Sequence, residues 1–176
     1  MKTVLTIGGS NSKKSITKQL AEYIGSLVDE VQVINIDLND YELPLYSVDI
    51  ESEVGIPDEA HILNEIFDKA DGFVVTLAEH NGSYSVAFKN VYDWLSRIEN
   101  QVWRNKPMIL TSSSPGERGG STMLDIAKGR FPYMGATIVG SLAFPNFYDN
   151  FNDGKVINSD LNSEIKNMVE VFQKEI

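Results

Sequence analysis

Short apolar runs alternate along the chain with longer segments in which apolar residues recur at helical spacing. Thr3–Ile7 is a continuous apolar run of strand length, and Val31–Leu38 alternates with the period of two that is typical of a strand. Between them, apolar residues from Ile16 to Leu27 recur at i, i+4, i+7, i+8 and i+11, which places them on one helix face. This part of the chain is predicted to form a strand, a helix and a second strand.

The same alternation continues through the rest of the chain. Three further strands are predicted, at Gly72–Thr76, Pro107–Thr111 and Ala136–Ala143. Helical spacing recurs before or after each of them, over residues 62–70, 87–98, 121–128 and 161–172. Because parallel strands need crossover connections, five strands separated by helices predict an α/β fold with a mainly parallel sheet. Two connections, Asn39–Glu59 and Pro145–Asn158, are long enough to be either functional or small satellite structures.

Composition narrows the range of functions. The chain has 176 residues, which we expect to form one domain over residues 1–176, and it contains no cysteine. Disulfides, cysteine-ligated metals and thiol nucleophiles are therefore excluded. The net charge of −10 argues against nucleic acid and anionic membrane as partners, because both bind a basic surface. No apolar run approaches the ~20 residues that span a bilayer, and we expect the protein in the cytoplasm.

Three unusual loops follow predicted strands. In an open α/β sheet, ligands bind beyond the carboxyl ends of the strands, where the strand order reverses. The loops that meet this description are Gly8–Thr17, Leu77–Tyr84 and Ser112–Gly120. We therefore expect a ligand site at the edge where these loops meet.

The first loop is rich in groups that bind a phosphate. It carries Lys13 and Lys14 in an otherwise acidic chain and leads into a helix N-terminus, whose free N–H groups favour an anion. Hydroxyl donors come from Ser10, Ser12, Ser15 and Thr17. The alternative is that Ser15 only caps the helix and the other residues only form the turn.

Two nucleotide-binding motifs are incomplete or absent. Residues 8–15 lack the second glycine of a P-loop, where Lys13 stands instead, and no Rossmann G-x-G-x-x-G is present. These observations argue against ATP hydrolysis and against a dinucleotide bound in the crevice of the fold. A mononucleotide remains as the expected ligand. Asn81-Gly82 and Pro115-Gly116 are turn dipeptides that let a flat ligand approach the backbone, or are only turns.

At these three loops the sequence resembles the NADPH-dependent FMN reductase family, which includes azo-dye, quinone and chromate reductases. The family pattern G-S-x-R-x-x-S-x-N aligns with Gly9–Thr17, with Ser12 in place of arginine and Thr17 in place of asparagine. A second pattern, from P-E-Y-N to D-W-L-S, aligns with 78–96, and S-P-G-x-x-G-G matches 114–120 without a gap. In the second pattern Ala78 replaces proline and His80 replaces tyrosine.

The resemblance implies a flavodoxin-like three-layer sandwich, with a five-stranded parallel sheet and helices on both faces. It also implies an FMN site in which the phosphate is held by Ser10, Ser12, Ser15, Ile16 and Thr17. The isoalloxazine ring or the ribityl chain would be bordered by Glu79, His80, Asn81, Gly82, Ser113 and Gly116.

The implied activity is an FMN-dependent NAD(P)H oxidoreductase. A reduced nicotinamide, NADPH or NADH, would reduce FMN, and a small acceptor would then take the electrons in a ping-pong reaction. The acceptor would be a quinone, an azo compound, a metal oxyanion or free flavin. No catalytic acid or base and no metal is expected, because the flavin is the reactive centre. The alternatives are a flavodoxin-type electron carrier and a family member with weakened FMN binding. The resemblance also implies a homodimer or homotetramer.

Overall fold

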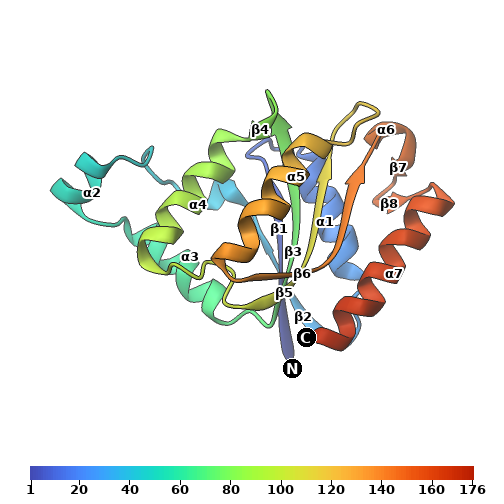
Figure 1. The fold of residues 1–176 in the computed structure, drawn as a ribbon, viewed down its shortest axis with the longest axis horizontal. Coiled ribbons are helices and arrows are strands. Elements are labelled where there is room, and N and C mark those ends of the chain that lie inside the picture. Colours follow the sequence, from blue (N-terminus) through green and yellow to red (C-terminus); the bar gives the residue numbers. More distant parts are fainter.

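A parallel β-sheet forms the centre of the computed structural model, which describes residues 1–176 (Figure 1). Its parallel strands are β1 (Lys2–Gly9), β2 (Val31–Ile36), β3 (Gly72–His80), β5 (Lys106–Ser113) and β6 (Ala136–Phe144). Their order across the sheet is β2-β1-β3-β5-β6, and each neighbouring pair is parallel. The predicted flavodoxin-like fold class is therefore confirmed.

The sheet has six strands instead of the five predicted. The sixth, β4 (Ser83–Tyr84), pairs antiparallel with the end of β3. The turn between them is Asn81-Gly82, whose φ angles of 53° and 75° both lie in the left-handed region. Asparagine and glycine tolerate this region best, and two such residues in succession form a tight hairpin. Residues 77–80, predicted as loop, therefore extend β3 up to this turn.

Helices cover both faces of the sheet (Figure 1). One face carries α1 (Ile16–Ser26) and α7 (Ser159–Glu175), whose apolar residues form a buried cluster that includes Leu20, Ile24 and Phe172. The other face carries α3 (Asp58–Asp68), α4 (Val86–Ile98) and α5 (Ser121–Arg130). The cluster under these three helices is larger and includes Leu63, Phe88 and Trp103.

The two long connections contain secondary structure of their own. The first includes the 3₁₀-helix η1 (Leu38–Asp40) and helix α2 (Val48–Val54), which buries none of its residues and projects away from the sheet (Figure 1). The second contains α6 (Phe147–Asn150) and the hairpin formed by β7 (Phe151–Asn152) and β8 (Lys155–Val156). A further 3₁₀-helix, η2 (Phe131–Met134), precedes β6.

Two glycines let α1 lie directly on β1. A Cβ on Gly8 would stand 2.6 Å from the Cα of Lys18, and a Cβ on Gly25 would collide with the side chain of Thr6. Backbone approaches this close are possible only without a side chain. They fix the N-terminus of α1 beside the carboxyl end of β1, where the candidate site lies.

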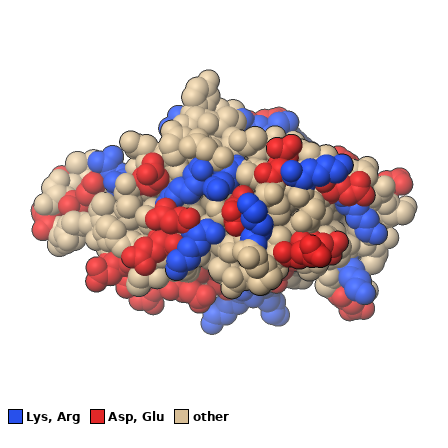
Figure 2. All heavy atoms as spheres, turned by 90° about the horizontal axis from the view of Figure 1, so that it is seen from below, with Lys and Arg blue, Asp and Glu red and all other residues tan.

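Charged side chains of both signs are interspersed on the edge of the molecule where the two chain ends lie (Figure 2). Pairs within the chain include Lys2–Asp71 at 3.5 Å and Arg104–Asp68 at 2.8 Å. No helix combines the length and the hydropathy that a bilayer crossing requires.

We expect two aspartates to make the stability of the fold fall in acid. The Thr3 N–H donates to Asp71 at 2.9 Å and lowers the pKa of this carboxyl, and the hydrogen bond from Lys18 lowers the pKa of Asp37. A lowered pKa adds stability above the unfolded pKa of ~4, and this stability is lost as the pH falls through the folded pKa. Urea unfolding at pH 7 and pH 3 should show that Asp71→Asn removes about 1 kcal/mol of this difference. An unchanged pH dependence would contradict the assignment.

Candidate functional site

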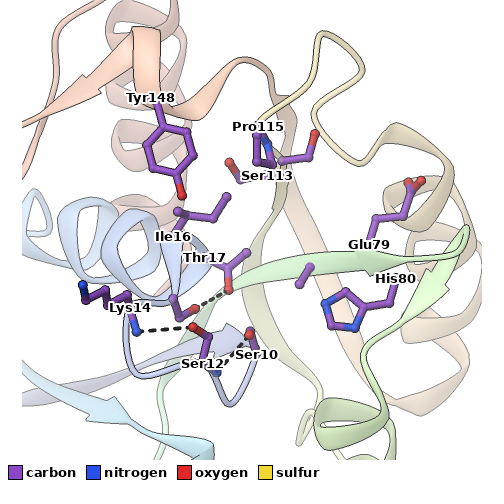
Figure 3. Close-up of a pocket in the computed structure, with 13 residues that line it drawn as sticks. Ser10, Ser12, Lys14, Ile16, Thr17, Glu79, His80, Ser113, Pro115 and Tyr148 are labelled. Carbon is purple, nitrogen blue, oxygen red and sulfur yellow. Dashed lines mark hydrogen bonds between the residues drawn. The ribbon is translucent and has the colours of Figure 1, made fainter.

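A cavity of about 210 Å³ lies at the carboxyl edge of the sheet, beyond the ends of β1, β3 and β5 (Figure 3). β1 and β3 are neighbours, but the connection after β1 leads through α1 to β2, and the connection after β3 leads through α4 to β5. The strand order therefore reverses between β1 and β3, which is where ligands bind in open α/β sheets. The cavity is lined by Ser10, Ser12, Lys14, Ser15, Ile16, Thr17, Ala78, Glu79, His80, Ser113, Ser114, Pro115 and Tyr148.

Most of the site residues predicted from the sequence line this cavity. They are Ser10, Ser12, Ser15, Ile16, Thr17, Glu79, His80 and Ser113. The structure does not place Asn81, Gly82 or Gly116 on its wall. Asn81 and Gly82 form the β3–β4 turn, and the carbonyl of Gly116 accepts the N–H groups of Gly119 and Asn146, which shapes the loop after β5.

The loop before α1 is folded by its own serines. The Ser12 N–H donates to Ser10 Oγ at 3.1 Å, and the Lys14 N–H donates to Ser12 Oγ at 3.3 Å. In both bonds the hydroxyl oxygen is the acceptor, so each serine keeps its own proton available for a ligand. The two serines can therefore shape the loop and bind an anion at once.

Ser15 both caps α1 and faces the cavity. Its Oγ accepts the Lys18 N–H at 3.1 Å and lies 2.9 Å from Thr17 Oγ1. The capping role considered from the sequence is therefore present in the structure. The N–H groups of Ile16 and Thr17, in the first turn of the helix, make no hydrogen bond within the protein. Free amides at a helix N-terminus favour an anionic ligand.

The hydroxyl of Ser113 is a buried polar group without a partner. Ser113 is 2% exposed, lines the cavity, and its Oγ makes no hydrogen bond. The preceding residue, Ser112, is also buried, but its Oγ donates to the Gly119 carbonyl at 2.7 Å. A buried hydroxyl without a partner costs free energy, so the Ser113 hydroxyl is free to pair with a water or a ligand group in the cavity.

Glu79 and His80 point in different directions at the end of β3 (Figure 3). The Glu79 carboxylate accepts the Met123 N–H in the first turn of α5 at 3.2 Å, so it satisfies a helix N-terminus in addition to lining the cavity. The exposed imidazole of His80 points toward the cavity (Figure 3).

The cavity also contains residues that the sequence prediction did not include. They are Lys14, Ala78, Ser114, Pro115 and Tyr148. The first four belong to the loops Gly8–Thr17, Leu77–Tyr84 and Ser112–Gly120. Tyr148 comes from α6, in the second long connection, and its hydroxyl points toward Ile16 (Figure 3). The only sequence signal for Tyr148 was the length of that connection.

Comparison with known protein families identifies the family to which this chain belongs. The sequence profile described as NADPH-dependent FMN reductase matches residues 2–149. The chain belongs to this family. The match spans β1 to α6 and so includes every element that contributes to the cavity.

Relatives of the chain are consistent with membership in this family. A quinone reductase of Escherichia coli (strain K12) is 33% identical over 118 residues, which are 67% of this chain and 63% of that protein. This chain therefore spans less than two thirds of that relative. A probable NADPH:quinone oxidoreductase 2 of Oryza sativa subsp. japonica is 26% identical over 176 residues, covering 94% of this chain and 84% of that protein.

Solved structures share the fold of this FMN reductase family member. FerB of Paracoccus denitrificans, described as a flavoenzyme NAD(P)H:(acceptor) oxidoreductase, superposes with a TM-score of 0.82. The superposition covers 99% of this chain and 97% of that chain, at 22% sequence identity. At this identity the likeness shows that the architecture is the same.

Proposed function

We propose that the cavity binds FMN, with the phosphate at the N-terminus of α1. The observation that carries the proposal is the convergence of unpaired donors on one cavity at the point where the strand order reverses. These donors are the free amides of Ile16 and Thr17 and the buried Ser113 hydroxyl. A phosphate bound at a helix N-terminus would accept the amides, and a polar group of the ribityl chain or ring would pair with Ser113.

Lys14 supplies the positive charge at the phosphate end. The family arginine is replaced by Ser12, which lacks a guanidinium, but Lys14 lines the cavity two residues later and makes no ion pair within the protein. Lysine acts as a point charge and not as a planar fork, so the site loses bidentate geometry but keeps a cation.

The ring end of the site would lie between two backbone segments, residues 78–80 of β3 and 113–115 after β5. FMN would supply two-electron redox chemistry between a reduced nicotinamide and a small acceptor such as a quinone in a ping-pong sequence, and the further proton needed to form a hydroquinone would come from solvent. The protein residues bind and orient the cofactor, and none of them is required to transfer a proton. The volume of about 210 Å³ is below the ~300–1,000 Å³ typical of ligand sites, so part of FMN would lie outside the cavity.

The test of this function is spectroscopic. The fluorescence of added FMN should be quenched when it binds the protein, and the quenching should saturate at micromolar FMN. Anaerobic NADPH or NADH should then bleach the flavin absorbance on the timescale of turnover, and a quinone should restore it. Bleaching by dithionite but not by nicotinamide would favour an electron carrier. Absence of saturation would favour a family member with weakened FMN binding. The predicted homodimer or homotetramer can be checked by light scattering in the same samples.

Replacing Ser113 with alanine should weaken flavin binding without lowering the stability of the fold. FMN affinity should fall about tenfold, which is one hydrogen bond of about 1.4 kcal/mol. The flavin-free protein should be as stable as wild type or slightly more stable, because a buried unpaired hydroxyl is removed. Fluorescence titration and urea unfolding measure the two quantities.

Two serines serve as controls for Ser113→Ala. Ser112→Ala should lose about 1 kcal/mol of stability, because its hydroxyl donates to Gly119. Ser52→Ala, on the projecting α2, should change neither quantity. Wild-type FMN affinity in Ser113→Ala would remove the serine from the proposed site.

A further inference from the structure

A second hollow adjoins the candidate FMN cavity. This groove has a volume of about 570 Å³ and shares Lys14, Ser15, Ile16 and Tyr148 with the cavity. One wall is the exposed side of α1, with Gln19 and Glu22, and the other is formed by α6 and the β7–β8 hairpin. The volume lies within the ~300–1,000 Å³ range of small-molecule sites.

The end of the groove nearest the cavity is positively charged. Lys13 and Lys14 are exposed, make no ion pair within the protein, and are the only two adjacent basic residues in a chain of net charge −10. Lys18 also lines the groove but is paired with Asp37 at 2.5 Å. Lys13 lines the groove without lining the cavity, so its charge is available to a ligand other than FMN.

An exposed aromatic ring stands on the boundary between the groove and the cavity. Tyr148 is 70% exposed, although its neighbours Phe147 and Phe151 are buried and stack with ring centroids 4.7 Å apart. The buried pair anchors α6, and Phe147 contacts the Tyr148 ring edge-to-face at 5.6 Å. Tyr148 is thus a flat surface held by a fixed support, which suits stacking with a nucleobase.

The far end of the groove carries hydrogen-bond acceptors. Glu22 is seven residues beyond Ser15 on α1, which is about 10 Å along a helix, and Asp153 lies on the opposite wall. Carboxylates accept hydrogen bonds from hydroxyl and amino groups but repel phosphate. Along α1 the groove therefore presents cations near Ser15 and a carboxylate at Glu22, with the carboxylate of Asp153 on the facing wall.

We propose that this groove binds the adenosine-phosphate half of the reduced nicotinamide dinucleotide. The adenine stacks on Tyr148, Lys13 pairs with the phosphate on the adenosine ribose, and Glu22 and Asp153 accept from ribose hydroxyl or adenine amino groups. The inference rests on the proposed function, because the nicotinamide half must reach the neighbouring flavin cavity. Since the 2′-phosphate is present only in NADPH, Lys13 favours NADPH over NADH.

The test uses fragments of the dinucleotide, so that binding is read without turnover. Calorimetric titration at low salt compares 2′,5′-ADP with 5′-ADP on FMN-saturated and on flavin-free protein. Lys13→Gln should weaken 2′,5′-ADP about threefold to fivefold, as for an exposed ion pair, and 5′-ADP less. Tyr148→Ala should weaken both ligands about tenfold through lost stacking. The control is Lys128→Gln on α5, on the opposite face of the sheet, which should change neither.

The outcomes separate this inference from the proposed function. The groove assignment would be overturned if Lys13→Gln and Tyr148→Ala left the fragment affinities unchanged, or if FMN displaced the fragments. Either result would count against the groove even if NADPH reduces the FMN bound to the protein. Fragment binding that depends on Lys13 and Tyr148 in flavin-free protein would support the groove even if FMN fails to bind. Steady-state kinetics give a second readout. Lys13→Gln should raise KM for NADPH several-fold, and it should change neither KM for NADH nor the Kd of FMN.

Discussion

Replacing Ser15 and Thr17 together with alanine is expected to weaken FMN binding about 10-fold to 100-fold. Both hydroxyls line the cavity at the N-terminus of α1. One hydroxyl of the Ser15–Thr17 pair donates to the other, so the pair has one donor left for the phosphate. A hydrogen bond to a charged group contributes about 1.5–3 kcal/mol, which corresponds to about 10-fold to 100-fold in Kd. Fluorescence titration of FMN measures this change.

The same double substitution should also destabilise the fold. Ser15 and Thr17 are 5% and 1% exposed, and Ser15 Oγ accepts the Lys18 N–H. Loss of the cap and of the buried hydroxyl pair should remove about 2 kcal/mol from the free energy of unfolding. FMN affinity therefore has to be measured under conditions in which the variant is folded, as judged by urea unfolding.

A cap at another helix provides the matched control for this experiment. Ser47 caps α2 by accepting the Asp49 N–H at 3.1 Å, and it does not line the cavity. Ser47→Ala should lose about 0.5–1 kcal/mol of stability without any change in FMN affinity. If the Ser15/Thr17 variant bound FMN as tightly as wild type, the phosphate assignment would have to be abandoned.

The fold was predictable because apolar periodicity follows from burial. Thr3–Ile7 lies within β1, and the apolar face of Ile16–Leu27 corresponds to α1, because a strand between two helical layers must be apolar and a surface helix must have one apolar face. The missed strand, β4, has two residues. A segment this short shows no period of two, and only its Asn-Gly turn indicated a hairpin.

The residues of the cavity were predictable from the sequence where they lie close to the end of a strand. Ser10, His80 and Ser113 come from three strand ends that the topology brings to one edge. Tyr148 reaches the same cavity from α6, and its position depends on the burial of Phe147 and Phe151 and not on a local pattern. The second role of Glu79, as an acceptor for α5, depends in the same way on tertiary packing that no spacing encodes.

Gly119→Ala is expected to be strongly destabilising, although Gly119 itself does not line the cavity. Gly119 has φ of +57°, and a Cβ there would stand 2.7 Å from the carbonyl carbon of Phe144, at the end of β6. The left-handed conformation costs an alanine about 1 kcal/mol, and displacing the adjacent backbone costs about 1–3 kcal/mol more. We expect a loss of about 3 kcal/mol in the free energy of unfolding and a fall of about 10 °C in Tm.

The same substitution should weaken FMN indirectly, because Gly119 fixes the segment that follows β5. Its carbonyl accepts the Ser112 hydroxyl and its N–H donates to the Gly116 carbonyl, so moving Gly119 moves the backbone beside Ser113 and Pro115. Gly116→Ala is the matched control in the same loop, since its Cβ would meet nothing closer than Ser114 Oγ at 3.9 Å. Gly116→Ala should therefore keep wild-type stability. Equal stability of the two variants would show that the loop accommodates a side chain at position 119, and the rigid support inferred for the cavity would not hold.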